Sequence, residues 1–299
     1  MSARVIDGKA AAARLRFRVA EQAARLKREH GILPCLAVVL VGDNPASTVY
    51  VASKNHAARE IGFFVRDIRH PASLPERKLL DIIAALNGDA SVHGILVQMP
   101  LPEPIRTHAV IEAIDPAKDV DGLTPLNLGR LMIGETTLER GLVACTPSGA
   151  LMLLKEAAGC DLSGRHAVII GRSQQVGRPM AHLLLQENCT VTIAHSRTAE
   201  LATHCRMADI IVAAAGHAEL VRGDWIKPGA TVIDVGINRI PAQGGKTRLT
   251  GDIAFTEVLP NAAAVTPVPG GVGPMTIACL MRNTLIAACM QAGLRQPEI

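Results

Sequence analysis

Residues 166–185, "HAVIIGRSQQVGRPMAHLLL", read as a buried strand, a tight turn and a helix. Gly171 would let the chain turn sharply, and Gly177 would let the helix approach the sheet closely. Backbone N–H groups at the start of such a helix can bind a pyrophosphate. Ser173 stands where the second glycine of the G-x-G-x-x-G pattern belongs. The segment alone therefore leaves open whether the turn binds a dinucleotide or only connects two elements.

The end of the next strand-like run indicates which dinucleotide would fit. A fold that binds NAD usually has Asp or Glu there to hold the ribose diol, but this chain reads His195-Ser196-Arg197. A hydroxyl and a guanidinium at that place, with Arg172 on the preceding turn, suit the additional phosphate of NADP. The alternative is that Arg197 is only a solvated surface charge.

Strands and helices alternate on both sides of this segment. The first half of the chain predicts helices at 8–30, 46–63, 74–88 and 107–114, strands at 35–44, 63–70 and 92–102, and a polar loop at 115–127. After a helix at 144–159, five strand-like runs begin near residues 165, 190, 208, 229 and 264, and a long apolar helix follows at 275–293, which we expect to pack on the first half of the chain. We expect Ser47 or Thr48 near the N-cap of the second helix and Thr146 at the cap of the helix at 144–159. This order predicts an α/β protein whose second half is a doubly wound, Rossmann-type sheet.

The composition agrees with such a fold. The 299 residues are 48% hydrophobic but only 2% aromatic, which suits parallel strands covered by Ala-rich helices, and the length suggests two domains. Lys and Arg exceed Asp and Glu by only 31 − 27 = 4 without a dense basic run, so we expect no nucleic acid partner.

The cysteines and the apolar segments point to a cytoplasmic protein. The seven cysteines are scattered, without a C-x-x-C pair or metal-ligand spacing, and we expect reduced, mostly buried thiols and no metal. The N-terminus lacks the apolar core of a signal peptide. We also expect no segment that spans a membrane.

The only tyrosine of the chain, Tyr50, precedes Lys54 by one helical turn. On a helix, both would share a face with Ala57 and Ile61, so Lys54 would point along an otherwise apolar stripe. The alternative is a lysine without a catalytic role, whose aliphatic stem covers apolar surface while its amine reaches water. Gln98 follows a predicted strand at the edge where active sites of open α/β sheets lie. A partly buried lysine at such an edge can act as an acid or base.

Asp119 and Asp121, in the loop "KDVDG", are the carboxylates that we expect near this lysine. A Tyr-x-x-x-Lys pair is also the signature of short-chain dehydrogenases. Those enzymes place the glycine-rich turn before the pair, whereas here the pair precedes the turn by more than a hundred residues. The inverted order argues against that family.

Together, these segments closely resemble the bifunctional methylenetetrahydrofolate dehydrogenase/methenyltetrahydrofolate cyclohydrolase family of one-carbon metabolism. The matching stretches run in order along nearly the whole chain: "VGDNPASTVYVASK", "GILVQMPLP", "PAKDVDG", "CTPSGALMLL", "GRSQQVGRPM", "HSRT", "KPGATVIDVGIN", "GDIAF" and "TPVPGGVGPMT". Ala144, Gln175, Leu123 and the stretch "GHA" at 216–218 depart from the family's usual residues.

The resemblance implies a homodimer that oxidises 5,10-methylenetetrahydrofolate with NADP and hydrolyses the methenyl product to 10-formyltetrahydrofolate. It implies a catalytic, folate-binding domain at 1–144, completed by 275–299, and a Rossmann-type NADP-binding domain at 145–274, with folate bound in the cleft between them. Three alternatives stay open: a dehydrogenase without the hydrolase step, a folate or nucleotide sensor without turnover, and an unrelated NADP oxidoreductase such as one acting on shikimate.

The resemblance also implies roles for individual residues. Lys54 would be the central catalytic residue, and Gln98 would hydrogen-bond to it and help to keep it partly neutral. Tyr50 would align the folate and stack near its reacting ring, and Asp121 would hold the pterin through its N–H donors. The other implied folate contacts are Pro100, Pro269, Gly270 and Gly271. The implied NADP contacts are Gly171, Arg172, Ser173, Ser196 and Ile237, to which the strand–turn–helix reasoning adds Gly177 and Arg197.

Overall fold

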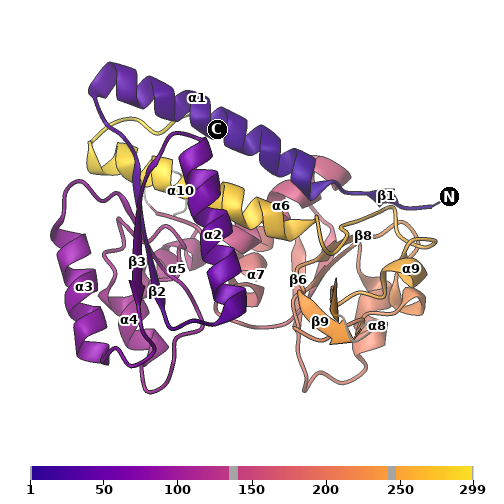
Figure 1. The fold of residues 1–299 in the computed structure, drawn as a ribbon. Helices are drawn as coiled ribbons and strands as arrows, with labels where there is room; N and C mark the ends of the chain where they lie inside the picture. Colours follow the sequence, from indigo (N-terminus) through magenta and orange to yellow (C-terminus); the bar gives the residue numbers. More distant parts are fainter. Residues whose placement is uncertain (1, 135–140, 242–246, 298) are drawn as a thin grey trace. The chain divides into compact units, whose positions relative to one another are not determined.

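The computed structural model describes residues 2–134, 141–241, 247–297 and 299 (Figure 1). The chain divides into two compact units. Unit 1 comprises Met1–Ala12 and Thr146–Thr276, and unit 2 comprises Ala13–Cys145 and Ile277–Ile299. The boundaries between the units fall within helices α1 (Gly8–His30), α6 (Cys145–Ala158) and α10 (Val272–Gln291).

Unit 1 contains a six-stranded parallel sheet. Its order is β1 (Arg4–Val5), β11 (Ala264–Val265), β8 (Thr231–Asp234), β7 (Ile210–Ala213), β5 (His166–Ile170) and β6 (Thr190–Ala194). Five of these strands are the five predicted runs, so the doubly wound sheet is confirmed. The sixth, β1, was not predicted, because a two-residue strand is too short to show a periodic pattern.

The shorter elements of unit 1 surround this sheet. They are α7 (Gly177–Gln186), α8 (Leu201–Met207), the 3₁₀ helix η1 (Gly223–Trp225) and α9 (Phe255–Val258). Strands β9 (Asn238–Pro241) and β10 (Thr247–Thr250) form an antiparallel pair that the sequence did not predict.

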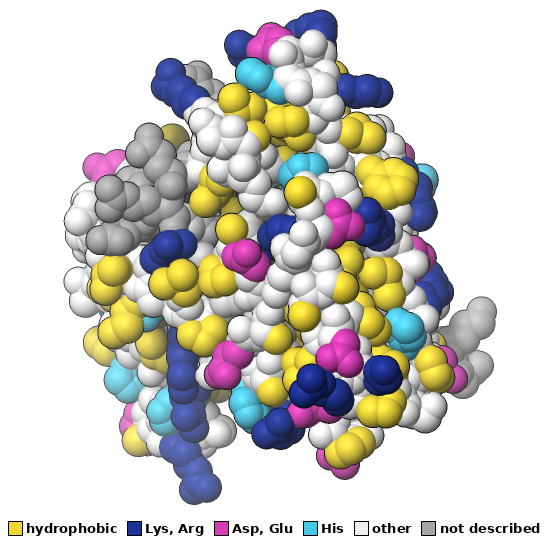
Figure 2. All heavy atoms as spheres, turned by 90° about the vertical axis from the view of Figure 1, so that its left-hand side faces the viewer, with side chains coloured by type: hydrophobic (Ala, Val, Ile, Leu, Met, Phe, Trp, Pro, Cys, Tyr) yellow, Lys and Arg dark blue, Asp and Glu magenta, His cyan; other side chains and the backbone are white. Residues whose placement is uncertain are grey.

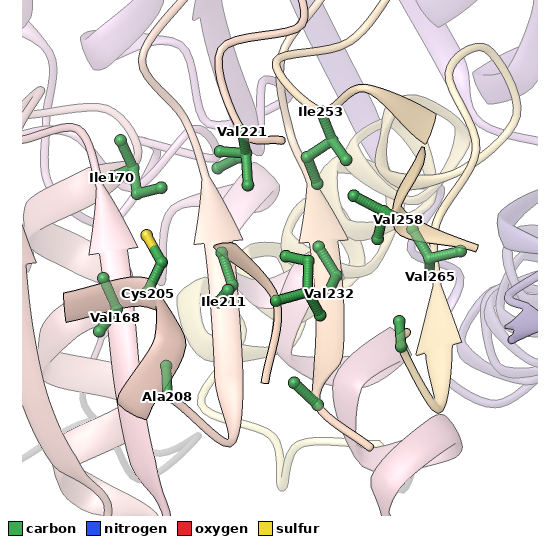
Figure 3. Packing of buried hydrophobic residues seen from close by; sticks show 14 of the residues in the cluster. Val168, Ile170, Cys205, Ala208, Ile211, Val221, Val232, Ile253, Val258 and Val265 are labelled. Atoms are coloured by element: carbon green, nitrogen blue, oxygen red, sulfur yellow. The ribbon is translucent and has the colours of Figure 1, made fainter. Parts of the chain in front are cut away.

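One apolar cluster covers a face of the sheet of unit 1 (Figure 3). Val168, Ile211 and Val232 come from three neighbouring strands and are fully buried, and Cys205 of α8 packs against them. Because both faces of an internal parallel strand are covered, the middle residues of each of these strands are consecutively apolar rather than alternating. This core fixes the carboxyl ends of β5, β6, β7 and β8 along one edge.

Unit 2 contains a three-stranded parallel sheet in the order β3 (Phe64–His70), β2 (Cys35–Val41) and β4 (Gly94–Val97). Its helices are α2 (Pro45–Glu60), α3 (Glu76–Gly88), α4 (Thr107–Ala113) and α5 (Pro125–Met132). Figure 1 shows α3 and α4 on one face of the sheet and α2 on the other. Every residue of β2 is buried, as expected for the central strand.

Three local predictions for unit 2 and α6 need correction. We expected Ser47 or Thr48 to cap α2, but the cap is Asn44, whose side-chain oxygen accepts hydrogen bonds from the N–H groups of residues 46 and 47. The predicted loop at 115–127 ends earlier, because Thr124 caps α5. Helix α6 begins at Cys145, so Thr146 lies within its first turn rather than at its cap.

Helix α10 is long and apolar enough to cross a membrane by length and composition, which differs from our expectation of no such segment. However, 72% of its apolar window is buried inside the protein, as in the core helix of a soluble fold. Asn283 of α10 donates to the carbonyl oxygens of Val120 and Val143 at 2.9 and 2.8 Å. The predicted packing of this helix on the first half of the chain is therefore confirmed.

The seven cysteines are all free thiols, as predicted, and only Cys160 is exposed. The surface of unit 2 carries paired charges, among them Arg106 with Glu76 and Arg66 with Asp89. On the face drawn in Figure 2, Lys and Arg side chains are interspersed with Asp and Glu. Pairs that remain in contact with water contribute little to stability.

A buried carboxylate joins the carboxyl end of β8 to the segment after β10. Asp234 is 3% exposed, and its oxygens accept hydrogen bonds from the N–H groups of Gly236 (3.0 Å), Asp252 (2.9 Å) and Ile253 (3.1 Å). Burial raises the pKa of Asp234 to about 7; these backbone donors oppose the shift and the charge of Asp252 adds to it.

The raised pKa of Asp234 predicts a pH-dependent stability. Between the ordinary value of 3.8 and about 7, the native state binds more protons than the unfolded state, so this group's contribution to stability is lost as the pH rises through that range. We expect Asp234→Asn to remove this dependence, so that the stability of the variant relative to the native chain increases from about pH 5 to about pH 8. Urea unfolding followed by the fluorescence of Trp225, the only tryptophan, measures it. If the free energies of unfolding of the variant and the native chain differ by the same amount at both pH values, the prediction is wrong.

Candidate functional site

Lys54 lies on α2 with its side chain almost fully enclosed. The residue is 8% exposed, and Ala57 and Ile61 on the same face are also buried, as the helical spacing predicted. Its amine Nζ donates a hydrogen bond of 2.9 Å to Oε1 of Gln98. The alternative of a lysine reaching into water is therefore wrong for Lys54.

Gln98 is held in one orientation by its own contacts. It follows β4 directly, and its backbone N–H donates to the carbonyl of Val39 on β2 at 2.9 Å. Its side-chain Nε2 donates to the carbonyl of Met99 at 2.7 Å, which leaves Oε1 turned toward Lys54. A neutral amide oxygen accepts a hydrogen bond from a charged or an uncharged amine. The contact therefore positions the amine without requiring a particular charge on it.

Two charged residues of the "KDVDG" loop are used to hold the loop itself. Lys118 is buried, and its Nζ donates to the carbonyl oxygens of Leu86, Asn87 and Asp89 at the end of α3, at 3.1, 2.8 and 2.8 Å. Asp119 is 1% exposed and accepts hydrogen bonds through Oδ2 from Thr124 N (2.8 Å) and Asn127 Nδ2 (2.9 Å). Asp119 is therefore a structural residue rather than a free acid.

Asp121, in contrast, is half-buried and interacts with Lys54. Burial raises the pKa of Asp121, the charge of Lys54 opposes that shift, and the charge of Asp119 adds to it. Burial also raises the pKa of Tyr50, which is half-buried one turn before Lys54. Among the described residues, no carboxylate lies within ion-pair distance of the Lys54 amine. The structure thus brings Lys54 together with Gln98 and Asp121, while Pro100 is exposed two residues after Gln98.

The glycine-rich turn after β5 has the close backbone approaches that the sequence predicted. Gly171 has φ +127°, and a Cβ atom there would lie 2.1 Å from the carbonyl oxygen of Ala214. A Cβ atom on Gly177 would lie 2.1 Å from the carbonyl oxygen of Gly171. Ser173 Oγ accepts hydrogen bonds from the N–H groups of Val176 (3.1 Å) and Gly177 (3.4 Å). Ser173, at the position of the second glycine of the G-x-G-x-x-G pattern, therefore stabilises the turn through its side chain.

Exposed cations stand at the carboxyl ends of β5 and β6. Arg172, Ser196 and Arg197 are all exposed, and neither guanidinium has an ion-pair partner among the described residues. The turn between them and the sheet is fixed, since Thr198 Oγ1 accepts from the N–H of His195 at 2.8 Å. The hydroxyl and guanidinium on the fixed turn after β6, with the Arg172 guanidinium on the turn after β5, suit a phosphate group.

The remaining predicted residues also belong to unit 1. Ile237 follows β8 and is 49% exposed. Pro269, Gly270 and Gly271 form a turn after β11, where a Cβ atom on Gly8 would lie 1.9 Å from the oxygen of Gly271. Among the described residues, no three His, Cys, Asp or Glu side chains are grouped as a metal site requires.

Sequence reasoning missed one residue next to these loops. Asp252 is fully buried and accepts four hydrogen bonds from the segments that follow β7 and β8. The stretch "GDIAF" was noticed only as part of the resemblance, since nothing in its spacing shows which strand ends the carboxylate reaches.

Models of one protein family match both parts of the chain. The model of the tetrahydrofolate dehydrogenase/cyclohydrolase catalytic domain matches residues 6–121, and the model of the NAD(P)-binding domain of the same family matches residues 144–292. The chain is 56% identical over 300 residues to the bifunctional protein FolD of Rhodopseudomonas palustris strain TIE-1, with all of both chains covered.

Two solved structures are similar over nearly the whole chain. The bifunctional FolD enzyme of Campylobacter jejuni is 47% identical with a TM-score of 0.90, covering 96% of this chain and 99% of that one. The Trypanosoma brucei methylenetetrahydrofolate dehydrogenase-cyclohydrolase, solved with NADP cofactor and an inhibitor, is 40% identical with a TM-score of 0.91, covering 96% and 98%. This chain therefore belongs to the tetrahydrofolate dehydrogenase/cyclohydrolase family.

Proposed function

We propose that this chain, an NADP-dependent methylenetetrahydrofolate dehydrogenase and methenyltetrahydrofolate cyclohydrolase, depends on Lys54 as its central catalytic residue. The observation that supports this role is the hydrogen bond of 2.9 Å from the Lys54 amine to Gln98. The amine is enclosed, faces a neutral partner, and interacts electrostatically with Asp121. A lysine that only stabilised the fold would instead be saturated by backbone oxygens, as Lys118 is.

The folate would bind to residues of the catalytic domain, 1–144 with 275–299. Tyr50 offers a half-buried aromatic ring for stacking. Asp121 offers carboxylate oxygens that can accept hydrogen bonds from the amino group and ring N–H of the pterin. Pro100, which is exposed two residues after Gln98, would line the same pocket.

NADP would bind to the domain 145–274, where it serves as the hydride acceptor when bound. The turn with Gly171, Ser173 and Gly177 offers backbone N–H groups for the pyrophosphate. Arg172, Ser196 and Arg197 would hold the phosphate that distinguishes NADP from NAD, and Ile237 would contact the nicotinamide end. Oxidation leaves a methenyl cation that the two nitrogens of the substrate stabilise, so these residues act mainly by orienting the substrate and the hydride acceptor.

Hydrolysis requires a proton-transfer group near the substrate. Water adds to the methenyl carbon, one C–N bond then breaks, and a proton must reach the nitrogen that leaves. Lys54 is a candidate for this transfer because its amine is fixed by Gln98 without a counter-charge at ion-pair distance.

Replacing Lys54 by Met should abolish cyclohydrolase turnover. Methionine fills a similar volume along the apolar face of α2, so the fold should be preserved while the proton-transfer group is lost. The measurement is the decay of the methenyl substrate in its near-ultraviolet absorbance, with NADPH formation followed in parallel. Full cyclohydrolase activity in Lys54→Met would refute the role.

Arg197 provides a second test because it should distinguish the two nicotinamide cofactors. Arg197→Ala removes a charged hydrogen-bond donor, so we expect the kcat/KM for NADP to fall by about tenfold or more while that for NAD changes little. Steady-state assays with each cofactor measure the ratio. An equal loss with both cofactors would show that Arg197 does not contact the distinguishing phosphate.

A homodimer in the cytoplasm would complete this proposal. The free thiols suit a reducing compartment, and subcellular fractionation tests the location. The edge strand β3 exposes Phe64 by 53%, and Val49 on α2 is 62% exposed, which suits association between copies. Sedimentation equilibrium should therefore give twice the chain mass of 31.6 kDa. A mass of one chain at assay concentrations would contradict the dimer.

A further inference from the structure

Asp252 joins the two loops that follow neighbouring strands of unit 1. Its Oδ2 accepts from the N–H groups of Ala215 (2.6 Å) and Gly216 (2.8 Å), just after β7. Its Oδ1 accepts from the N–H of His217 (2.9 Å) and from Nδ2 of Asn238 (2.8 Å), which begins β9. One carboxylate therefore sets the distance between the segment 215–217 and the segment 236–238.

Asp234 holds the same region through a second set of hydrogen bonds. Its carboxylate accepts from the N–H groups of Gly236 and of Asp252. Ile237 therefore lies between Gly236, which Asp234 holds, and Asn238, which Asp252 holds. The packing is too close for side chains at two glycines. A Cβ atom would lie 2.1 Å from Asp252 Oδ1 if placed on Gly236, and 1.7 Å from Asp234 Oδ2 if placed on Gly251.

These loops occupy a defined place relative to the cofactor residues. The glycine turn follows β5, and Arg197 follows β6 on one side of β5, whereas β7 and β8 lie on the other side. In a doubly wound fold a dinucleotide crosses the point where the strand order reverses. With the pyrophosphate at the turn after β5 and the adenosine phosphate near Arg197, the nicotinamide half must lie over the ends of β7 and β8.

We propose that Asp252 is a positioning residue for the nicotinamide half of NADP, acting through the two loops that it joins. This inference builds on the proposed cofactor contacts. Both oxygens of Asp252 accept hydrogen bonds from donors of the protein, so the carboxylate has no acceptor site left for a ligand. Asp252 therefore touches no reacting atom. It acts by keeping Gly216 and Ile237 at a fixed separation, which sets the slot in which the nicotinamide ring lies.

The carboxylate, rather than any side chain of its size, is needed for this role. In Asp252→Asn the amide has one oxygen and one NH₂ group. Whichever way the amide is turned, its NH₂ group faces two of the four donors. At least two hydrogen bonds are thus lost, either those from residues 215 and 216 or those from His217 and Asn238, and the loop concerned is partly released.

The experiment compares two ligands that share only the adenosine half. We expect Asp252→Asn to weaken NADP binding by about tenfold or more, because the cofactor must then order a loop that two hydrogen bonds to a charged group no longer hold. Binding of 2′,5′-ADP, which probes the region of Arg197 alone, should change by less than about twofold, because that half makes no contact with the released loop. Isothermal titration calorimetry measures both. Asp224→Asn makes the same chemical change at a carboxylate of unit 1 that is 71% exposed, and should alter neither.

Catalysis provides a readout that a purely structural role would not move. In Asp252→Asn the dehydrogenase kcat should fall by about tenfold or more, since a displacement of the order of 1 Å slows a positioned reaction strongly. The primary isotope effect with deuterated methylene substrate should rise as hydride transfer becomes slower. Cyclohydrolase activity on methenyl substrate without cofactor should stay within about twofold of the native value, since it needs no positioned nicotinamide.

Each outcome decides the question. Equal weakening of NADP and 2′,5′-ADP would show general damage to unit 1 and overturn the proposal, as would unchanged NADP binding. If Asp252→Asn does not fold, Asn238→Ala removes one of the four donors and should weaken NADP binding more than 2′,5′-ADP binding, by a smaller factor. An unchanged ratio of the NADP and 2′,5′-ADP affinities in Asn238→Ala would overturn the proposal. Absence of dehydrogenase and cyclohydrolase activity in the native chain would instead refute the proposed function.

Discussion

The enclosure of the Lys54 amine against a neutral amide is the interaction on which the site of unit 2 depends. Withdrawing an amine from water is costly unless it is hydrogen-bonded, and here Gln98 supplies that bond at 2.9 Å. A carboxylate at the same place would form an ion pair and favour the protonated amine. The amide oxygen instead positions the amine without placing an opposite charge beside it.

The neighbouring charges show how unit 2 separates structural from chemical groups. Lys118 is as buried as Lys54, yet its three hydrogen bonds go to the carbonyl oxygens that end α3. Asp119 is likewise used to hold the start of α5. Only Asp121, between these fixed residues and Gly122, keeps a half-buried carboxylate that can meet a ligand. The rigid loop therefore positions one acid next to one amine.

The sequence predicted the elements that have a periodic or apolar pattern, and missed those set by single contacts. Strands β5, β7 and β8 have consecutive apolar residues because both of their faces are covered, so they were recognisable. Strand β1 has two residues and exists only because β11 pairs with it. Asn44 caps α2 in place of the expected Ser47, since Pro45 occupies the first helical position and the turn before it presents Asn44. Such choices depend on neighbours that the pattern does not show.

The same difference separates the candidate site residues. The Tyr50–Lys54 face and Gln98 were found because helical spacing and the end of a strand place them together. Asp252 was not, because the donors that define it come from residues 215–217 and 238, far away in the sequence.

Units 1 and 2 use buried charge in opposite ways. In unit 2 the Lys54 amine has one side-chain hydrogen-bond partner among the described residues, Gln98, and retains capacity for a ligand. In unit 1 the Asp252 carboxylate accepts hydrogen bonds from four donors of the protein, so it has little capacity left to bind a ligand. An effect of Asp252 on hydride transfer must therefore pass through the geometry of the loops, whereas an effect of Lys54 can arise from its own chemistry.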